Sequence, residues 1–525
     1  MENTNTSDPE QPSCFSAIQI LPPTENQVTI CEKNCLYLTE DADQLRCNSH
    51  VTQISSYKRI EVNNELEKFR IVSSSVRSAF VKQQSNYWQK ISRAWKTCGI
   101  SGIVQELSVI EGSLDDNQKA TWTFNLQKLT EKVLTCILNA QKRWFPASFM
   151  INKQLEASYL HPHGKRSSIV ALAWHPHISK FAVGFKDNTV RIMSLTNDKY
   201  NLLKHGQQEG VTCLAWRPFA GSTLAVGGLH GIIIWYLNST RDTTSRQGIR
   251  LLECKKHSPV VTMAWSPTGN YLASGCPLDN ALMIWDVESE TCTPLRRSGG
   301  ISLLKWSPDG SKLFAASSES IFRVWETRWW SCEKWSRLKS SCKSACWSPD
   351  GKILLFSLRN DSSLYFLNFK DGKLGSSGEV ATNLTNLQRF EFGNGVKVGG
   401  NICNLSWEND GSRLAVTFSN NDDDEESNSE VIVTFLTTLK PNFRISLCGF
   451  IRGEANETPD LIEFHSSRIN KTLLSVCWSS GYMSFIPFYL NELRQIRQTG
   501  TINSPMPNQP TMKNNITLYS NIEQQ

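Results

Sequence analysis

The sequence predicts a mostly β protein, a seven-bladed β-propeller with an N-terminal helical extension and disordered termini. The first observation is its tryptophan content, 17 among 525 residues. The second is a unit that recurs seven times: an alternating apolar strand that ends in an aromatic residue, a turn, and further short strands. The third is the spacing of those aromatic residues, which is 42, 49, 41, 41, 60 and 57 residues. Repeats of about 40–45 residues are typical of four-stranded WD40 blades, so the predicted fold class is a seven-bladed WD40 β-propeller.

The two ends of the chain differ from its middle in composition. Residues 1–26 and 491–525 are polar and rich in Asn, Gln, Pro and Thr. Such segments bury too little apolar surface to fold, so we expect both termini to be disordered. Between them, residues 27–150 form an N-terminal extension and residues 151–490 form the propeller.

The extension is expected to be largely helical, at about 76–97 and 117–143. In the first helix Trp88, Ile91 and Trp95 fall at helical spacing, with Lys and Arg between them. Two interpretations remain open. The two helices pack on the propeller as a pair, or this aromatic face docks a partner helix or a membrane surface. The face is the candidate partner-docking site.

Each blade of the propeller is anchored by the aromatic residue at the end of its first strand. Strand alternation lets a blade bury both of its faces only between two neighbours. In the seventh copy Trp478 follows a segment that resembles a second strand, so Phe464 is the better anchor. The predicted anchors are Trp174, Trp216, Trp265, Trp306, Trp347, Trp407 and Phe464.

The third blade carries a full set of the polar residues typical of a WD repeat. His257, Ser274, Asp279 and Trp285 can hydrogen-bond in sequence across one blade and hold its strands together. A second interpretation is that His257, Ser274 and Asp279 form a hydrolytic triad. Their spacing is that of the repeat and the sequence lacks a G-x-S-x-G nucleophile motif, which favours the structural interpretation.

A closed ring requires an outer strand for the last blade. Two segments are candidates, Tyr159–Arg166 just before the first blade and Val28–Ile30 far upstream. The sequence does not distinguish between them.

Composition and motifs argue against several classes of function. The net charge is +6, and residues 57–145 account for all of that excess, which argues against direct nucleic-acid binding. No run of about 18 apolar residues and no apolar signal segment are present, so we expect the 16 cysteines to be thiols of a reducing compartment. No CxxC, P-loop or H-E-x-x-H motif occurs, and we expect no enzyme activity, metal or cofactor.

Several strings are more specific than the generic repeat. They are Ala173–His177, Trp330–Trp335 and Cys448–Glu454, and through them the chain resembles the aladin family of WD-repeat nucleoporins over about residues 27–489. The chain departs from the pattern at Phe464, which lacks a following X-Pro turn, and in its Asn-rich tail.

The resemblance implies a non-enzymatic scaffold of the nuclear pore complex in the nuclear envelope. It implies docking to a transmembrane nucleoporin and other pore components, indirect membrane contact, and support of nucleocytoplasmic transport, with further roles at the spindle and in the cytoplasm. The alternative is a soluble WD40 adaptor, such as a ubiquitin-ligase substrate receptor or a signalling scaffold.

Overall fold

The structure is a computed structural model, and it describes the propeller together with short pieces outside it. The described residues are 15, 20–33, 35–41, 57–61, 520–522 and 168–489, the last without 196, 238–248, 255–256, 280, 290, 296–299, 337, 370–381, 420–428, 440–442 and 468–470. All regular secondary structure in these residues is β-strand. The predicted helices at 76–97 and 117–143 lie outside them, as does the candidate strand Tyr159–Arg166.

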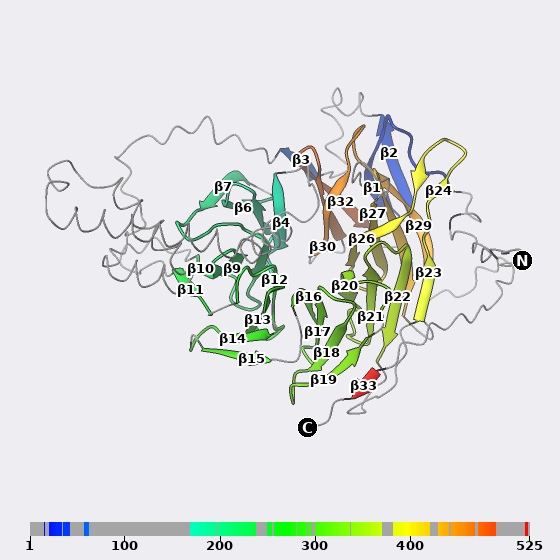
Figure 1. Cartoon of the computed structure of the whole chain (residues 1–525). Helices are drawn as coiled ribbons and strands as arrows, with labels where there is room; N and C mark the ends of the chain where they lie inside the picture. The colour runs from blue at the N-terminus through cyan, green and yellow to red at the C-terminus, as the bar shows by residue number, and fades with distance from the viewer. Residues whose placement is uncertain are drawn as a thin grey trace, which may run out of the picture.

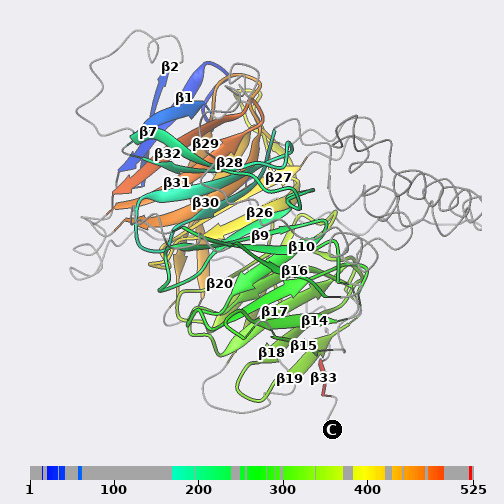
Figure 2. The same ribbon diagram turned by 90° about the vertical axis from the view of Figure 1, so that its left-hand side faces the viewer.

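Seven sheets follow one another as blades (Figures 1 and 2). The first strand of each blade lies beside the first strand of the next, and β30 of the last blade lies beside β4 of the first, so the ring is closed. The strands of the first three blades are β4 (Ile169–Trp174), β5 (Lys180–Phe185), β6 (Val190–Ser194), β7 (Asn197–Leu203), β8 (Cys213–Trp216), β9 (Thr223–Gly228), β10 (Gly231–Tyr236), β11 (Ile249–Leu252), β12 (Thr262–Trp265), β13 (Tyr271–Gly275), β14 (Leu282–Asp286) and β15 (Thr291–Leu295).

The next three blades repeat the same antiparallel order. A two-stranded hairpin, β24 (Phe390–Glu391) with β25 (Lys397–Val398), joins the fifth blade to the sixth. The blade strands are β16 (Ile301–Trp306), β17 (Lys312–Ser317), β18 (Phe322–Glu326), β19 (Ser331–Trp335), β20 (Cys342–Trp347), β21 (Ile353–Leu358), β22 (Ser363–Asn368), β23 (Thr382–Asn386), β26 (Asn401–Trp407), β27 (Arg413–Ser419), β28 (Val431–Thr438) and β29 (Arg444–Arg452).

Burial along the strands explains why the sequence repeats as it does. Every residue of β21 is buried, since neighbouring blades cover both faces of a central strand. The edge strand β15 is largely exposed. Turns after the anchors use glycines with positive φ, at Gly269, Gly310 and Gly351, with φ of 74°, 73° and 69°. Glycine enters this region without steric cost, so these turns can be tight.

The seventh blade is completed by the N-terminal part of the chain. Its own strands are β30 (Pro459–Ser467), β31 (Lys471–Trp478) and β32 (Tyr482–Tyr489). Strand β1 (Gln27–Lys33) pairs parallel with β32 and antiparallel with β2 (Leu36–Asp41), while β3 (Tyr57–Glu61) pairs antiparallel with β32. The blue strands lie beside the orange β32 in Figure 1. Of the two candidate segments, the upstream one containing Val28–Ile30 therefore lies in the strand that extends this blade.

Short parts of both terminal segments have described positions in contact with the propeller. Phe15 has no solvent exposure and packs in the core of the fifth and sixth blades, 6.4 Å from the ring of Phe392. The Pro22 carbonyl accepts a hydrogen bond from Asn394. At the other end, β33 (Ser520–Ile522) adds antiparallel to the outer strand β19. Local composition does not reveal that one aromatic residue of a polar segment can insert into a core. It also does not reveal that a short segment can pair with an open sheet edge.

Candidate functional site

Four side chains predicted from the repeat form one hydrogen-bonded chain across the third blade. Trp285 Nε1 donates to Ser274 Oγ at 2.8 Å, and Ser274 Oγ lies 2.8 Å from His257 Nε2. His257 Nδ1 lies 3.2 Å from Asp279 Oδ2. With a neutral histidine protonated at Nδ1, each group donates or accepts in one consistent direction, so the network is satisfied throughout.

The serine, histidine and aspartate of this network are connected as in a hydrolytic triad, but solvent and substrate cannot reach the serine. Ser274 has no solvent exposure and His257 is 1% exposed. The serine oxygen already receives the indole N–H of Trp285. Burial lowers the pKa of His257, opposed by the hydrogen bond and charge of Asp279. Ser274 lies in β13 and Trp285 in β14, so their hydrogen bond links two strands, and His257 and Asp279 tie the adjoining loops to them.

The anchor tryptophans bind each blade to the one before it. In four successive blades the indole Nε1 donates to the carbonyl of the residue that precedes the previous anchor. The pairs are Trp216 to Ala173 (3.1 Å), Trp265 to Ala215 (3.2 Å), Trp306 to Ala264 (3.0 Å) and Trp347 to Lys305 (3.0 Å). The anchors therefore form a ladder of contacts between blades as well as a hydrophobic core.

The ladder changes where the ring closes. Trp407 donates to Thr437 Oγ1 of its own blade at 3.2 Å. Phe464 has no indole nitrogen and is 8% exposed in the core between the sixth and seventh blades. Across the closing contact, Trp174 donates to Ser475 Oγ at 2.9 Å and stacks on His465 with ring centroids 4.3 Å apart. The departure seen in the sequence at Phe464 is matched by a different set of contacts.

A buried ionic network holds the N-terminal hairpin, β1 and β2, against the sixth and seventh blades. Arg413 Nη2 lies 2.9 Å from Glu32 Oε2, and both side chains are fully buried. Glu408 lies 3.6 Å from Arg413 and accepts hydrogen bonds from Ser412 and Thr472. A buried charge is costly unless it is paired, so this arrangement requires the hairpin to be in place.

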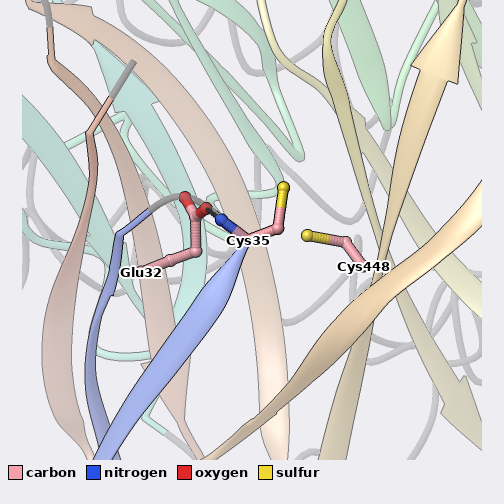
Figure 3. A group of neighbouring side chains, drawn as sticks. All are labelled: Glu32, Cys35 and Cys448. Carbon is pink, nitrogen blue, oxygen red and sulfur yellow. Dashed lines mark hydrogen bonds between the residues drawn. The ribbon is translucent and has the colours of Figure 1, made fainter. Parts of the chain in front are cut away.

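Beside this network the structure brings together Glu32, Cys35 and Cys448 (Figure 3). A carboxylate oxygen and the two sulfurs all lie within 4.8 Å of one another. The Tyr37 hydroxyl lies 2.5 Å from Thr434 Oγ1 and donates to Cys448 Sγ at 3.6 Å. A Cβ at Gly449 would come within 2.3 Å of the Tyr37 ring, so this glycine provides the space in which the hairpin packs.

Sequence reasoning missed the hairpin contacts because the residues lie about 380 positions apart or more. One signal was available, since Arg413 is the only charged residue of its strand, at the start of Arg413–Ser419. A second was Glu408, which occupies the position after an anchor where the third, fourth and fifth blades have serine. The predicted docking residues Trp88, Ile91 and Trp95 lie outside the described residues. Within the described part, no helix has the length and apolar character needed to cross a membrane.

Comparisons with known proteins agree with this architecture. Residues 155–489 match the family model described as the aladin seven-bladed propeller. The chain is 32% identical over 342 residues to Aladin of Arabidopsis thaliana, covering 60% of this chain and 75% of that protein.

Weaker similarity extends to two proteins with other names. A protein of Arabidopsis thaliana named cell division cycle 20.1, cofactor of APC complex, is 28% identical over 205 residues, which are 37% of this chain and 43% of that one. The anaphase-promoting complex subunit cdc20 of Dictyostelium discoideum is 26% identical over 38% of this chain and 39% of its own.

Proposed function

Because the chain belongs to the aladin family of seven-bladed propellers, we propose that it is a non-enzymatic scaffold subunit of the nuclear pore complex. It docks to a transmembrane nucleoporin, contacts other pore components, and supports nucleocytoplasmic transport, with further roles at the spindle and in the cytoplasm. Membrane contact is indirect, through the partner. The observation that carries the proposal is the family match over residues 155–489, which spans the blade strands β4 to β32.

The closed ring supports a scaffold mechanism. Its blades are fixed to one another by the anchor ladder and by the N-terminal hairpin, so loops on its two faces keep their relative positions. Such a body presents several binding surfaces at once, and two partners held together gain effective concentration for each other. Large apolar side chains on its surface include Phe219, 79% exposed, and Trp329, 63% exposed.

The proposal is tested by the location of a fluorescently tagged full chain in cells. We expect a ring at the nuclear rim, and proximity labelling should recover a transmembrane protein of the pore membrane. A diffuse cytosolic signal without such labelling would contradict the proposal.

The candidate docking face is tested in the same assay. Trp88→Glu and Trp95→Glu should abolish the rim signal while the melting temperature of the purified protein is retained. Gln89→Glu, which adds the same charge at a polar position of the predicted helix, is the matched control and should stay at the rim. Loss of the melting transition in the tryptophan variants would instead assign these residues to packing.

A soluble adaptor is the second candidate function. The observation that favours it is the similarity to chains named as a cofactor or subunit of the anaphase-promoting complex. That similarity covers less than half of either chain, whereas the aladin similarity covers most of both. Recovery of a soluble multiprotein complex, with no pore-membrane protein in the labelled set, would favour the adaptor.

A further inference from the structure

Two thiols from distant parts of the chain meet at the seam that the N-terminal hairpin closes. Cys35 lies in the turn between β1 and β2, and Cys448 lies in β29 of the sixth blade. Their sulfurs lie within 4.8 Å of each other, and Figure 3 shows the two side chains pointing toward one another. No disulfide joins cysteines in the part of the chain that the structure describes.

The backbone on each side holds its thiol at this place. Cys35 has φ of 64°, a conformation that few non-glycine residues adopt, and its N–H donates to the Glu32 carboxylate. Cys448 stands at a bulge, between the pairs Thr434↔Gly449 and Phe435↔Leu447, so it has no partner in the β28–β29 register. A bulge redirects a side chain away from the regular pleat.

The two thiols differ in pKa and in burial, as expected for a pair in which one cysteine attacks the oxidant and the other then forms the disulfide. Cys35 is half-buried, and a hydrogen bond from the Cys448 thiol lowers its pKa to about 7, against the effects of burial and of Glu32. Cys448 is buried, and its contact with Cys35 raises its pKa. Since the thiolate is the nucleophile, Cys35 is the group that reacts first and Cys448 the group that follows.

We propose that Cys35 and Cys448 form a reversible disulfide, with hydrogen peroxide as oxidant, that fastens the N-terminal hairpin to the sixth blade. In the first step Cys35 Sγ attacks a peroxide oxygen, the O–O bond breaks, and Cys35 becomes a sulfenic acid with release of water. In the second step Cys448 Sγ attacks the Cys35 sulfur, the S–O bond breaks, and a second water leaves as the S–S bond forms. Two thiols lose two electrons and two protons, and the peroxide is reduced to two waters.

The disulfide would stabilise a place where few backbone pairs hold the N-terminal hairpin to the ring. Strand β1 is registered with β32 at only two described positions, Glu32↔Phe488 and Lys33↔Tyr489. The hairpin otherwise depends on side-chain contacts such as those of Glu32 with Arg413 and of Tyr37 with Thr434. A covalent link between residues 35 and 448 closes a loop that contains almost the whole ring, so opening of the seam would be suppressed in the oxidised protein.

The third member of the cluster argues against a metal ion as the occupant. The Glu32 carboxylate is engaged by the Arg413 guanidinium and by the Cys35 N–H. A cation placed at the two sulfurs would lie next to that buried positive charge. The pair of thiols is thus better suited to bond to each other.

The chain contains an internal control. Cys254 and Cys292 also contact each other through their thiols, but burial and the neighbouring cysteine raise the pKa of Cys254 to about 11. Brief exposure of the full reduced chain to hydrogen peroxide, followed by alkylation in denaturant and peptide mass mapping, compares the two pairs directly. We expect a peptide joined through Cys35 and Cys448 while Cys254 and Cys292 are recovered alkylated. Recovery of alkylated Cys35, or earlier oxidation of the Cys254 pair, would overturn the proposal.

Hydrogen exchange tests the structural consequence. Oxidation should slow amide exchange in residues 27–41, and a dithiol reductant should restore the original rate. The Cys35→Ser variant keeps a side chain of similar size at this half-buried turn position and should show no response to peroxide. If the exchange rate is the same before and after the disulfide forms, the bond does not hold the hairpin in place. If Cys35→Ser still responds to peroxide, Cys35 is not the reacting cysteine.

Discussion

Single polar atoms decide how firmly neighbouring strands and blades of this protein are held together. The indole nitrogens of Trp216, Trp265 and Trp306 each reach a carbonyl of the preceding blade, and that of Trp285 reaches Ser274 within its own blade. Buried donors and acceptors must find partners. An indole N–H therefore fixes the orientation of the ring relative to its acceptor, whereas an apolar ring of similar size does not.

The network of the third blade predicts a large effect of Trp285→Ala. The side chain is 2% exposed and its loss removes a large aromatic ring and the donor to Ser274. We expect destabilisation of about 3–5 kcal/mol in denaturant unfolding. Trp329→Ala is the control, because that ring is 63% exposed and its removal should cost within about 0.5 kcal/mol. Equal effects of the two changes would contradict the role of the network.

His465 predicts that the closing contact weakens in acid. Burial, and secondarily His175, lowers its pKa from 6.5 to about 4. The unfolded chain then binds the proton first as the pH falls, so this contribution to stability is complete above about pH 6.5 and is lost as the pH falls toward 4. The melting temperature of wild type should therefore decline more steeply over this interval than that of His465→Phe, which keeps a ring against Trp174.

A second buried group, Glu463, titrates in the same pH interval, so wild type must be compared with His465→Phe. Burial raises the pKa of this carboxyl to about 7, with Lys305 opposing, so the folded chain takes up its proton first and gains stability as the pH falls. Its effect runs against that of His465 over the same interval. Only the difference between wild type and His465→Phe reports the histidine, and parallel curves for the two proteins would contradict the assignment.

Among the elements, the N-terminal hairpin connects two neighbouring blades. Strand β1 extends the seventh blade and carries Glu32 into the ionic network, while β2 carries Tyr37 against Gly449 and Thr434. The same short element thus contacts both blades at the seam and supplies the charge that balances Arg413.

Arg413 predicts how strongly the hairpin depends on that charge. Replacement of Arg413 by alanine leaves Glu32 and Glu408 buried without their cation, which should destabilise the protein by about 3–5 kcal/mol. Glu288→Gln, which breaks the exposed Arg217–Glu288 pair, is the control and should cost at most about 1 kcal/mol. Urea unfolding measures both, and a small effect at Arg413 would show that the pair does not hold the hairpin.

On the scale of the whole molecule, stability depends on closure. Each blade buries its faces against two neighbours, and the first and seventh meet through Trp174, Ser475 and His465. A ring interrupted at one seam exposes apolar faces and a sheet edge, and an open edge invites pairing with another chain.

Removal of residues 1–41 tests this dependence. The shortened chain loses β1, β2 and Phe15, so we expect a lower melting temperature and aggregation in size-exclusion chromatography. Removal of residues 491–525 deletes only the short strand β33 from the described structure and should leave the melting temperature close to that of the full chain. If the two truncated chains melt alike, the hairpin does not stabilise the seventh blade.

Local sequence determined the repeated parts of this protein. Alternation and spacing gave the blades and their anchors, and the set His257, Ser274, Asp279 and Trp285 was recognisable because all four lie within 29 residues. Tertiary structure alone decided how the seventh blade is completed. It determines which distant strand joins β32, why Arg413 is tolerated in a core, and why Cys35 meets Cys448. The physical reason is that periodicity records which face of a strand is buried, whereas a buried charge or a thiol acquires its partner only when residues hundreds of positions apart are folded together.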